Sequence, residues 1–122
     1  MVLVSKTSSV ASDLNKSLKI KTDSLKRLEK DYIYYQKELE EQKNRVELCK
    51  KDPTKDEYDL KKQVEILDEN NAMIVDTVKR LTDSLTVLAE FLEEQAEKKD
   101  SLDQYNEAME LMERLYQQFI NE

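Results

Sequence analysis

Apolar side chains recur every three or four residues over most of this chain, a spacing that lines them along one side of an α-helix. A heptad repeat fits from about residue 12, and only Lys21 and Gln42 interrupt its inward stripe. The a and d positions of this repeat hold Leu14, Leu18, Lys21, Leu25, Leu28, Tyr32, Tyr35, Leu39, Gln42, Val46 and Cys49. The pattern therefore predicts a first long helix over about residues 12–51.

The stretch KKDPTKDE interrupts this pattern. Pro53 has no amide proton and disfavours the helical conformation at Asp52, so the first helix is expected to end here. Thr54 and Glu57 have the spacing of a capping box, which predicts that a second helix begins at once, near residue 55. A connection this short makes the two helices antiparallel.

The second helix is predicted over about 55–98, with Asn71 as the one polar residue on its inward stripe. Such a residue often fixes helix register. The stripe is Leu60, Val64, Leu67, Asn71, Ile74, Val78, Leu81, Leu85, Leu88 and Leu92.

A third, shorter helix is predicted over about 101–121, where Ser101 and Gln104 offer another capping-box spacing. Its apolar positions, again in steps of three and four, are Leu102, Tyr105, Met109, Met112, Tyr116 and Phe119.

These elements predict an all-α fold, an antiparallel three-helix bundle formed by residues 12–122 as a coiled-coil-like rod. Residues 1–11 are rich in serine and small side chains and are expected to form a flexible tail. The short third helix can cover only the part built from about 14–38 and 75–98. The remaining part, over 39–71, should be two helices thick with a more polar seam. That end could accept a partner or a second copy of the chain.

Composition favours the same fold and limits the function. The chain has 122 residues, of which 39% are charged, with no glycine and one proline. The net charge of −7 argues against nucleic acid or an anionic membrane as a partner. The single cysteine fits a reducing compartment, and no stretch has the length of a secretory or membrane-spanning segment. A cytoplasmic protein is therefore expected.

Catalysis is not expected. The chain has no histidine, the commonest general base and transition-metal ligand, and no glycine for a phosphate-binding loop. No cofactor and no metal are predicted. Cys49 is interpreted as a small core residue, with a reactive thiol as the alternative.

Two surface features are better candidates for recognition. A run of cationic side chains extends from Lys16 to Lys30, and it is either a solvated helix face or a strip that faces an acidic protein partner. Several apolar residues lie off the inward stripe and are either contact residues or incidentally exposed: Ile20, Ile33, Tyr34, Ile66 and Met73.

Two segments carry more than a heptad requires. LKIKTDSLKRLEKDYIYYQKELEEQ (18–42) and EYDLKKQVEILDEN (57–70) together resemble the tubulin-binding cofactor A family of tubulin-specific chaperones. The first element is carried by Lys19, Ile20, Lys21, Thr22, Leu25, Lys26, Arg27 and Leu28. The second is carried by Tyr58, Asp59, Leu60, Lys61, Lys62, Gln63, Glu65 and Leu67.

The resemblance covers about residues 18–95, with three departures. Val75 stands where the family usually has a proline, which predicts a straighter second helix. The serine-rich start is longer than expected, and the third helix matches only in length and pattern.

The resemblance implies a three-helix bundle that captures quasi-native β-tubulin released from the cytosolic chaperonin. It would hold this subunit, without hydrolysing nucleotide, until other tubulin-folding cofactors assemble the αβ heterodimer. A cytoplasmic monomer or homodimer associated with the microtubule cytoskeleton is expected. The predicted contact residues are Lys26, Arg27, Tyr34, Tyr58, Asp59, Lys61 and Lys62.

Two other functions fit the same pattern. One is a structural coiled-coil subunit of a larger complex, with no affinity for tubulin. The other, a general holdase like a prefoldin subunit, is disfavoured because KDPTKDE is too short for a β-hairpin. The Tyr58–Asp59 motif also has a purely structural interpretation, since acids in a first helical turn complement the helix dipole.

Overall fold

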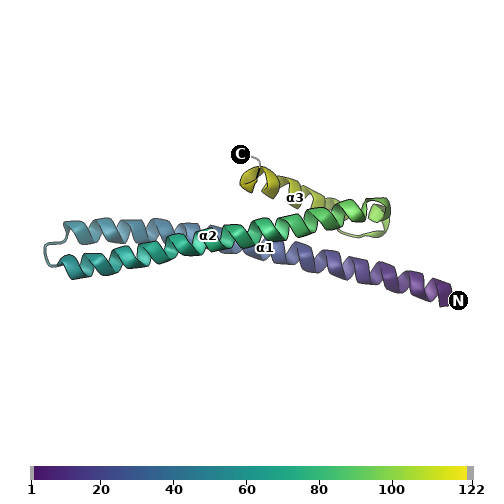
Figure 1. The fold of residues 1–122 in the computed structure, drawn as a ribbon, viewed down its shortest axis with the longest axis horizontal. Coiled ribbons are helices and arrows are strands. Elements are labelled where there is room, and N and C mark those ends of the chain that lie inside the picture. The colour runs from purple at the N-terminus through teal and green to yellow at the C-terminus, as the bar shows by residue number, and fades with distance from the viewer. Residues whose placement is uncertain (1, 121–122) are drawn as a thin grey trace. The chain divides into compact units, whose positions relative to one another are not determined.

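The computed structural model describes residues 2–120, with side chains from Val10 onward. Its elements are α1 (Val2–Lys51), α2 (Glu57–Glu94), the 3₁₀ helix η1 (Ala96–Ser101) and α3 (Tyr105–Phe119) (Figure 1). The described part of the chain contains no strand. The predicted all-α, three-helix fold is confirmed.

The chain divides into two compact units. Unit 1 consists of residues 1–27 and 81–122, and unit 2 consists of residues 28–80. The third helix belongs to unit 1, and unit 2 contains two helical segments. This division agrees with the expectation that the short third helix covers only part of the two long ones.

Several helix ends differ from the predicted ones. α1 begins at Val2 rather than near residue 12. Residues 1–11 were predicted to form a flexible tail. The side chains of residues 1–9 lie outside those that the structure describes, so this flexibility stays a prediction. α2 ends at Glu94, and η1 separates it from α3. α2 is one uninterrupted helix through Val75.

Unit 2 is a helical hairpin (Figure 1). Two sets of hydrogen bonds hold its turn. Asp52 Oδ1 accepts from the backbone N–H of Thr54 at 2.9 Å and from its hydroxyl at 2.6 Å. At the start of α2, the Asp59 N–H donates to Asp56 Oδ1 at 2.9 Å and the Asp56 N–H donates to Asp59 Oδ2 at 3.1 Å. The reciprocal cap is therefore Asp56–Asp59, and the prediction of a Thr54–Glu57 box was wrong. Because the cap lies at Asp56 rather than at Thr54, Asp52 can close the turn through Thr54 before α2 begins.

The seam of unit 2 is polar. Among its described side chains, only Gln42, Val46 and Thr77 are buried. The Gln42 amide donates to the backbone oxygen of Gln63 at 2.8 Å and to its Oε1 at 2.9 Å. Thr77 donates its hydroxyl to the Met73 carbonyl at 2.7 Å. The expectation of a thin, polar two-helix segment is confirmed.

The inward stripe of α2 in unit 2 differs from the predicted one. Val64 and Asn71 are exposed, whereas Gln63 and Asn70 are half-buried and Thr77 is buried. The inward positions are therefore one residue earlier than predicted at these points. The Gln63 amide gains a partner in Gln42 by facing the seam, which explains the shift.

Unit 1 contains most of the apolar core. α1 contributes Leu18 and Leu25, and the connection between η1 and α3 contributes Leu102. The α2 residues predicted for this region, Leu81, Leu85, Leu88 and Leu92, are all buried. Burial of these leucine side chains is the main apolar contribution to the stability of unit 1.

The inward face of α3 differs from the predicted one after Tyr105. Its buried residues are Tyr105, Ala108, Leu111 and Leu115. Met109 and Met112 are only half-buried and Tyr116 is exposed. The prediction followed a second apolar stripe that lies one residue further along the helix.

Polar side chains fasten the connection between α2 and α3 within unit 1. The Asn15 carboxamide donates to the Ser101 carbonyl at 3.3 Å and accepts from the Asp103 N–H at 2.9 Å. The buried Tyr105 hydroxyl donates to the Leu92 carbonyl at 2.6 Å. The predicted Ser101–Gln104 capping box is absent, because Ser101 bonds Lys98 instead and Gln104 makes no side-chain cap.

Within the described residues, none of the helices combines the length and apolar character needed to cross a bilayer.

Candidate functional site

The seven predicted contact residues do not belong to one unit. Lys26 and Arg27 lie on the α1 segment of unit 1. The other five lie in unit 2, with Tyr34 on α1 and the remainder in the first turns of α2. We therefore describe the two groups separately.

Lys26 and Arg27 are both exposed, because the neighbouring Leu25 is fully buried and turns the inward side of the helix away from them. Neither side chain forms an ion pair or a hydrogen bond with another described residue. Both charges are therefore available to a partner.

The lysines that precede this pair are mostly engaged within unit 1. Lys19 pairs with Asp23 at 3.1 Å. Lys21 donates to the Ser17 hydroxyl at 2.7 Å, and its ammonium lies 4.8 Å from the centre of the Phe91 ring. Lys21, which interrupted the inward stripe in the sequence, thus packs against the core with its charge on an aromatic face.

The motif at the start of α2 separates into structural and available side chains. Asp59 is a half-buried member of the helix cap. Lys62 lies over the Tyr58 ring, 5.4 Å from its centre, and pairs with Glu65 at 3.8 Å. Lys61 is exposed and has no ion pair or hydrogen bond among the described residues. Asp59 therefore has the structural role that the dipole interpretation allowed, and Lys61 is available for binding.

Two tyrosines of this group present large apolar surfaces to solvent. Tyr58 is 64% exposed and Tyr34 is 57% exposed. The Tyr34 ring meets Tyr35 edge to face, with 5.5 Å between their centres. Exposed aromatic side chains that a neighbour holds in place are frequent contact residues, because little side-chain entropy is lost on binding.

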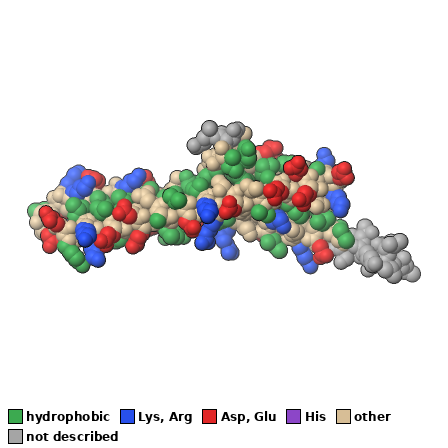
Figure 2. Space-filling view, in the orientation of Figure 1, with side chains coloured by type: hydrophobic (Ala, Val, Ile, Leu, Met, Phe, Trp, Pro, Cys, Tyr) green, Lys and Arg blue, Asp and Glu red, His purple; other side chains and the backbone are tan. Residues whose placement is uncertain are grey.

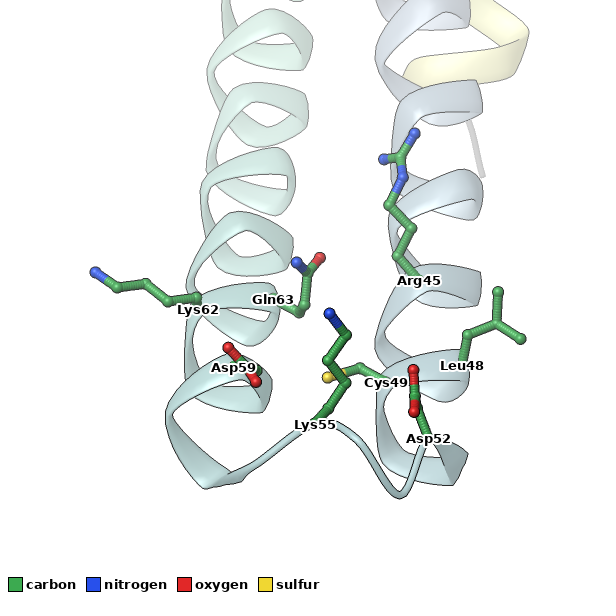
Figure 3. Close-up of a pocket in the computed structure, with 8 residues that line it drawn as sticks. All are labelled: Arg45, Leu48, Cys49, Asp52, Lys55, Asp59, Lys62 and Gln63. Atoms are coloured by element: carbon green, nitrogen blue, oxygen red, sulfur yellow. The ribbon is translucent and has the colours of Figure 1, made fainter.

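A pocket of about 300 Å³ opens between the two helices at the turn of unit 2 (Figure 3). We call it the turn pocket. It is lined by Asp59 and Lys62 from the predicted group and by six residues that the prediction did not include: Arg45, Leu48, Cys49, Asp52, Lys55 and Gln63. Tyr58 and Lys61 do not line it, so the predicted α2 residues are divided between two surfaces.

Leu48 is the one lining residue that the sequence pattern could have added to the predicted contact residues. It is 68% exposed and lies two heptads after Tyr34, at the same position of the repeat. The same spacing that placed Tyr34 off the seam could have identified Leu48. Lys55 could not have been found this way, because a turn has no heptad position.

Cys49 lies at the seam, as predicted, but it is only half-buried and its thiol faces the turn pocket (Figure 3). Unit 2 contains only two helical segments, so the side of Cys49 that faces the pocket is not covered by a third one. The interpretation of Cys49 as a core residue is therefore only partly correct.

Electrostatics at the turn follow from its hydrogen bonds. The two donors of Thr54 stabilise the ionised carboxylate, and they lower the pKa of Asp52 below its ordinary value of 3.8, with a smaller contribution from Lys55. Asp52 is thus committed to closing the turn. On the visible face of unit 2, acidic, basic and apolar side chains are interspersed (Figure 2).

Comparison with known proteins gives a consistent family assignment. Residues 13–112 match the family described as "Tubulin binding cofactor A". The Tubulin-specific chaperone A of Dictyostelium discoideum is 47% identical over 110 residues, covering 90% of this chain and 97% of that protein. The protein of the same name from Homo sapiens is 36% identical over 93 residues, covering 76% and 84%.

Two solved structures are similar to this chain. Human tubulin chaperone cofactor A has a TM-score of 0.69 at 31% identity, covering 84% of this chain and 97% of that one. Tubulin folding cofactor A from Arabidopsis thaliana has a TM-score of 0.70 at 31% identity, covering 84% and 98%. The resemblance found in the sequence is confirmed.

Proposed function

The chain belongs to the tubulin binding cofactor A family, and from that premise we propose that it captures β-tubulin as a folding chaperone. It binds the quasi-native subunit after release from the chaperonin and passes it on for assembly of the αβ heterodimer. The binding is stoichiometric and takes place on helical faces, without enzymatic chemistry. The family match over residues 13–112 is the observation that carries this proposal.

The side chains support a binding role. Lys26, Arg27 and Lys61 are exposed cations with no ion pair among the described residues, although the chain as a whole is acidic. In unit 2, the exposed ring of Tyr58 lies three residues before Lys61 on the same helix. Unpaired cations and exposed aromatic rings suit an acidic protein surface, because cations steer the encounter and the rings supply buried area. We place this activity in the cytoplasm, in association with the microtubule cytoskeleton. The active form is a monomer or homodimer that works beside other tubulin-folding cofactors.

Co-elution tests the proposal. Wild-type protein is expected to elute with β-tubulin in size-exclusion chromatography. A variant that combines Lys26→Glu, Arg27→Glu, Lys61→Glu and Lys62→Glu is expected to lose co-elution while its circular dichroism stays unchanged.

The matched control reverses four other exposed lysines, namely Lys37, Lys50, Lys98 and Lys99. It changes the net charge by the same amount and is expected to keep co-elution. If wild-type protein never co-elutes with β-tubulin, the function is wrong. If the test variant binds as well as the control does, the contact residues are wrong.

A further inference from the structure

In unit 2, α2 carries two overlapping stripes, and only one of them is centred on α1. This inward stripe contains Gln63, which accepts from Gln42, and the buried Thr77. The second stripe lies on the flank of the helix, and its side chains are exposed or half-buried along its whole length. We call it the flank stripe, and it consists of Leu60, Val64, Leu67, Asn71, Ile74 and Val78.

The flank stripe has the composition of one strand of a two-stranded coiled coil. Its residues alternate in steps of three and four, with valine at a positions and leucine or isoleucine at d positions. β-Branched residues at a and leucine at d favour a pair of helices. The contact with α1 leaves this pattern largely unused, since Val64 is 37% exposed and the adjacent Val75 is 70% exposed. Burial of the flank stripe therefore needs another helix.

Asn71 indicates which helix fits. It occupies the a position between Val64 and Val78, is exposed, and forms no hydrogen bond with another described residue. In a parallel, in-register pair each a residue meets its own counterpart, so the two Asn71 carboxamides can bond each other. An antiparallel pair would place Asn71 against an apolar d residue and leave its buried amide without a partner. An identical helix in parallel register therefore satisfies the amide.

We infer that the flank stripe is the interface of a homodimer, in which α2 pairs in parallel with α2 of a second copy. The inference selects one of the two forms named above, and it does not depend on tubulin binding. The stretch from Leu60 to Val78 spans about 27 Å along a helix. A strip of this length and one helix width is small for a specific interface, so the dimer is expected to dissociate on dilution.

Charges beside the flank stripe suit the same arrangement. In a parallel pair, each g residue lies beside the following e residue of the other helix. Asp68 then lies beside Gln63 of the second copy, whose amide N–H groups are free to donate because Gln42 occupies only its oxygens. Asp56 lies beside Lys61 of the second copy, which has the opposite charge. Such exposed pairs orient the two helices more than they strengthen the dimer.

Disulfide crosslinking tests the register. Cys49→Ser removes the only cysteine of the chain. In that background, Asn71→Cys places a thiol where a parallel pair brings the two copies within disulfide distance. Glu69→Cys is the matched control, because Glu69 is exposed at an f position of the same helix, away from the flank stripe.

With oxidised glutathione, Asn71→Cys is expected to give at least about fivefold more covalent dimer than Glu69→Cys, as read on a non-reducing gel. Equal yields would overturn the parallel pairing.

A charge at position 71 tests the interface without a crosslink. Asn71→Asp sets two carboxylates against each other in the dimer, and it is expected to raise the dissociation constant of the dimer by at least about tenfold. Asn44→Asp adds the same charge at an exposed position of α1 and is expected to change that constant by less than about threefold. Sedimentation equilibrium measures both. Circular dichroism checks that the helices persist, as expected for substitutions at exposed positions.

The outcomes keep this inference apart from the proposed function. Equal dissociation constants for Asn71→Asp and Asn44→Asp would overturn the interface. Wild-type protein that binds β-tubulin but stays monomeric at every concentration would overturn the dimer and leave the proposed function standing. If such a monomer lost β-tubulin through Asn71→Asp, the flank stripe would belong to the client, which also overturns the dimer. A dimer that passes both tests without binding β-tubulin would support the interface and overturn the proposed function.

Discussion

The side-chain amide of Gln42 is only 1% exposed and donates to both oxygens that Gln63 presents to it, at 2.8 and 2.9 Å. Gln42 also accepts from Arg45. This buried polar contact joins the two helices of unit 2 where a leucine layer would otherwise be expected. A satisfied polar layer of this kind fixes the register of a helix pair at some cost in stability.

Gln42→Ala should lower the free energy of unfolding by about 1–3 kcal/mol, because it leaves a cavity and unpaired polar groups of Gln63 and Arg45. Asn44→Ala is the control on the same helix. Asn44 is exposed, and its loss should cost less than about 0.5 kcal/mol. Urea denaturation followed by circular dichroism measures both. Equal values would show that the Gln42 contact adds nothing.

The register of α3 gives a second prediction. Leu115 is fully buried and Tyr116 is 43% exposed. Leu115→Ala should therefore cost about 2–5 kcal/mol, and Tyr116→Ala should cost clearly less, although tyrosine is the larger side chain. Thermal unfolding of the two variants ranks them. The opposite ranking would restore the stripe that the sequence alone suggested.

The cap of α2 gives a third prediction. Asp56→Ala removes the acceptor for the Asp59 N–H and should cost about 0.5–2 kcal/mol. Glu57→Ala removes the residue that the sequence placed in the capping box, and it should cost less than Asp56→Ala. Chemical denaturation of both variants is the measurement. A larger loss for Glu57→Ala would contradict the observed cap.

The turn should also respond to pH in one direction. Because the hydrogen bonds from Thr54 depress the pKa of Asp52 below 3.8 in the folded chain, its stabilising effect is complete above that value. The effect should be lost as the pH falls through the lower, folded-state pKa. Wild-type protein and Asp52→Asn should therefore differ in stability at neutral pH and converge in strong acid. A difference that grows below pH 3.8 would contradict this assignment.

The heptad pattern identified the fold because each long helix has an apolar stripe and a single proline-containing turn separates the two. It failed where two stripes compete. On α3, Ala108, Leu111 and Leu115 are each followed by another apolar residue, so spacing alone allowed either face. On α2, the pattern favoured Val64 over Gln63 as the inward residue because valine is more apolar. Gln63 faces the seam instead, because its side chain accepts a hydrogen bond from Gln42. A cross-helix hydrogen bond of this kind leaves no trace in a one-dimensional pattern.

The candidate site was predictable to a similar degree. The motifs identified exposed cations such as Lys26 and Lys61, because runs of charge on a helix are exposed by default. The sequence allowed a structural role for Asp59 in the first helical turn, but it could not show the reciprocal bonds with Asp56. Nor could it show that Lys62 is held by Tyr58 and Glu65, because these contacts depend on side-chain geometry. Lys55 was missed as a lining residue of the turn pocket because only the folded turn brings it between two helices.

The affinity of wild-type protein for folding-competent β-tubulin, measured by isothermal titration calorimetry at two salt concentrations, tests the central claim most directly. We predict a saturable complex with one β-tubulin per chain, weaker at the higher salt concentration because exposed cations contribute to binding. The absence of any complex while the chain is fully helical would contradict it.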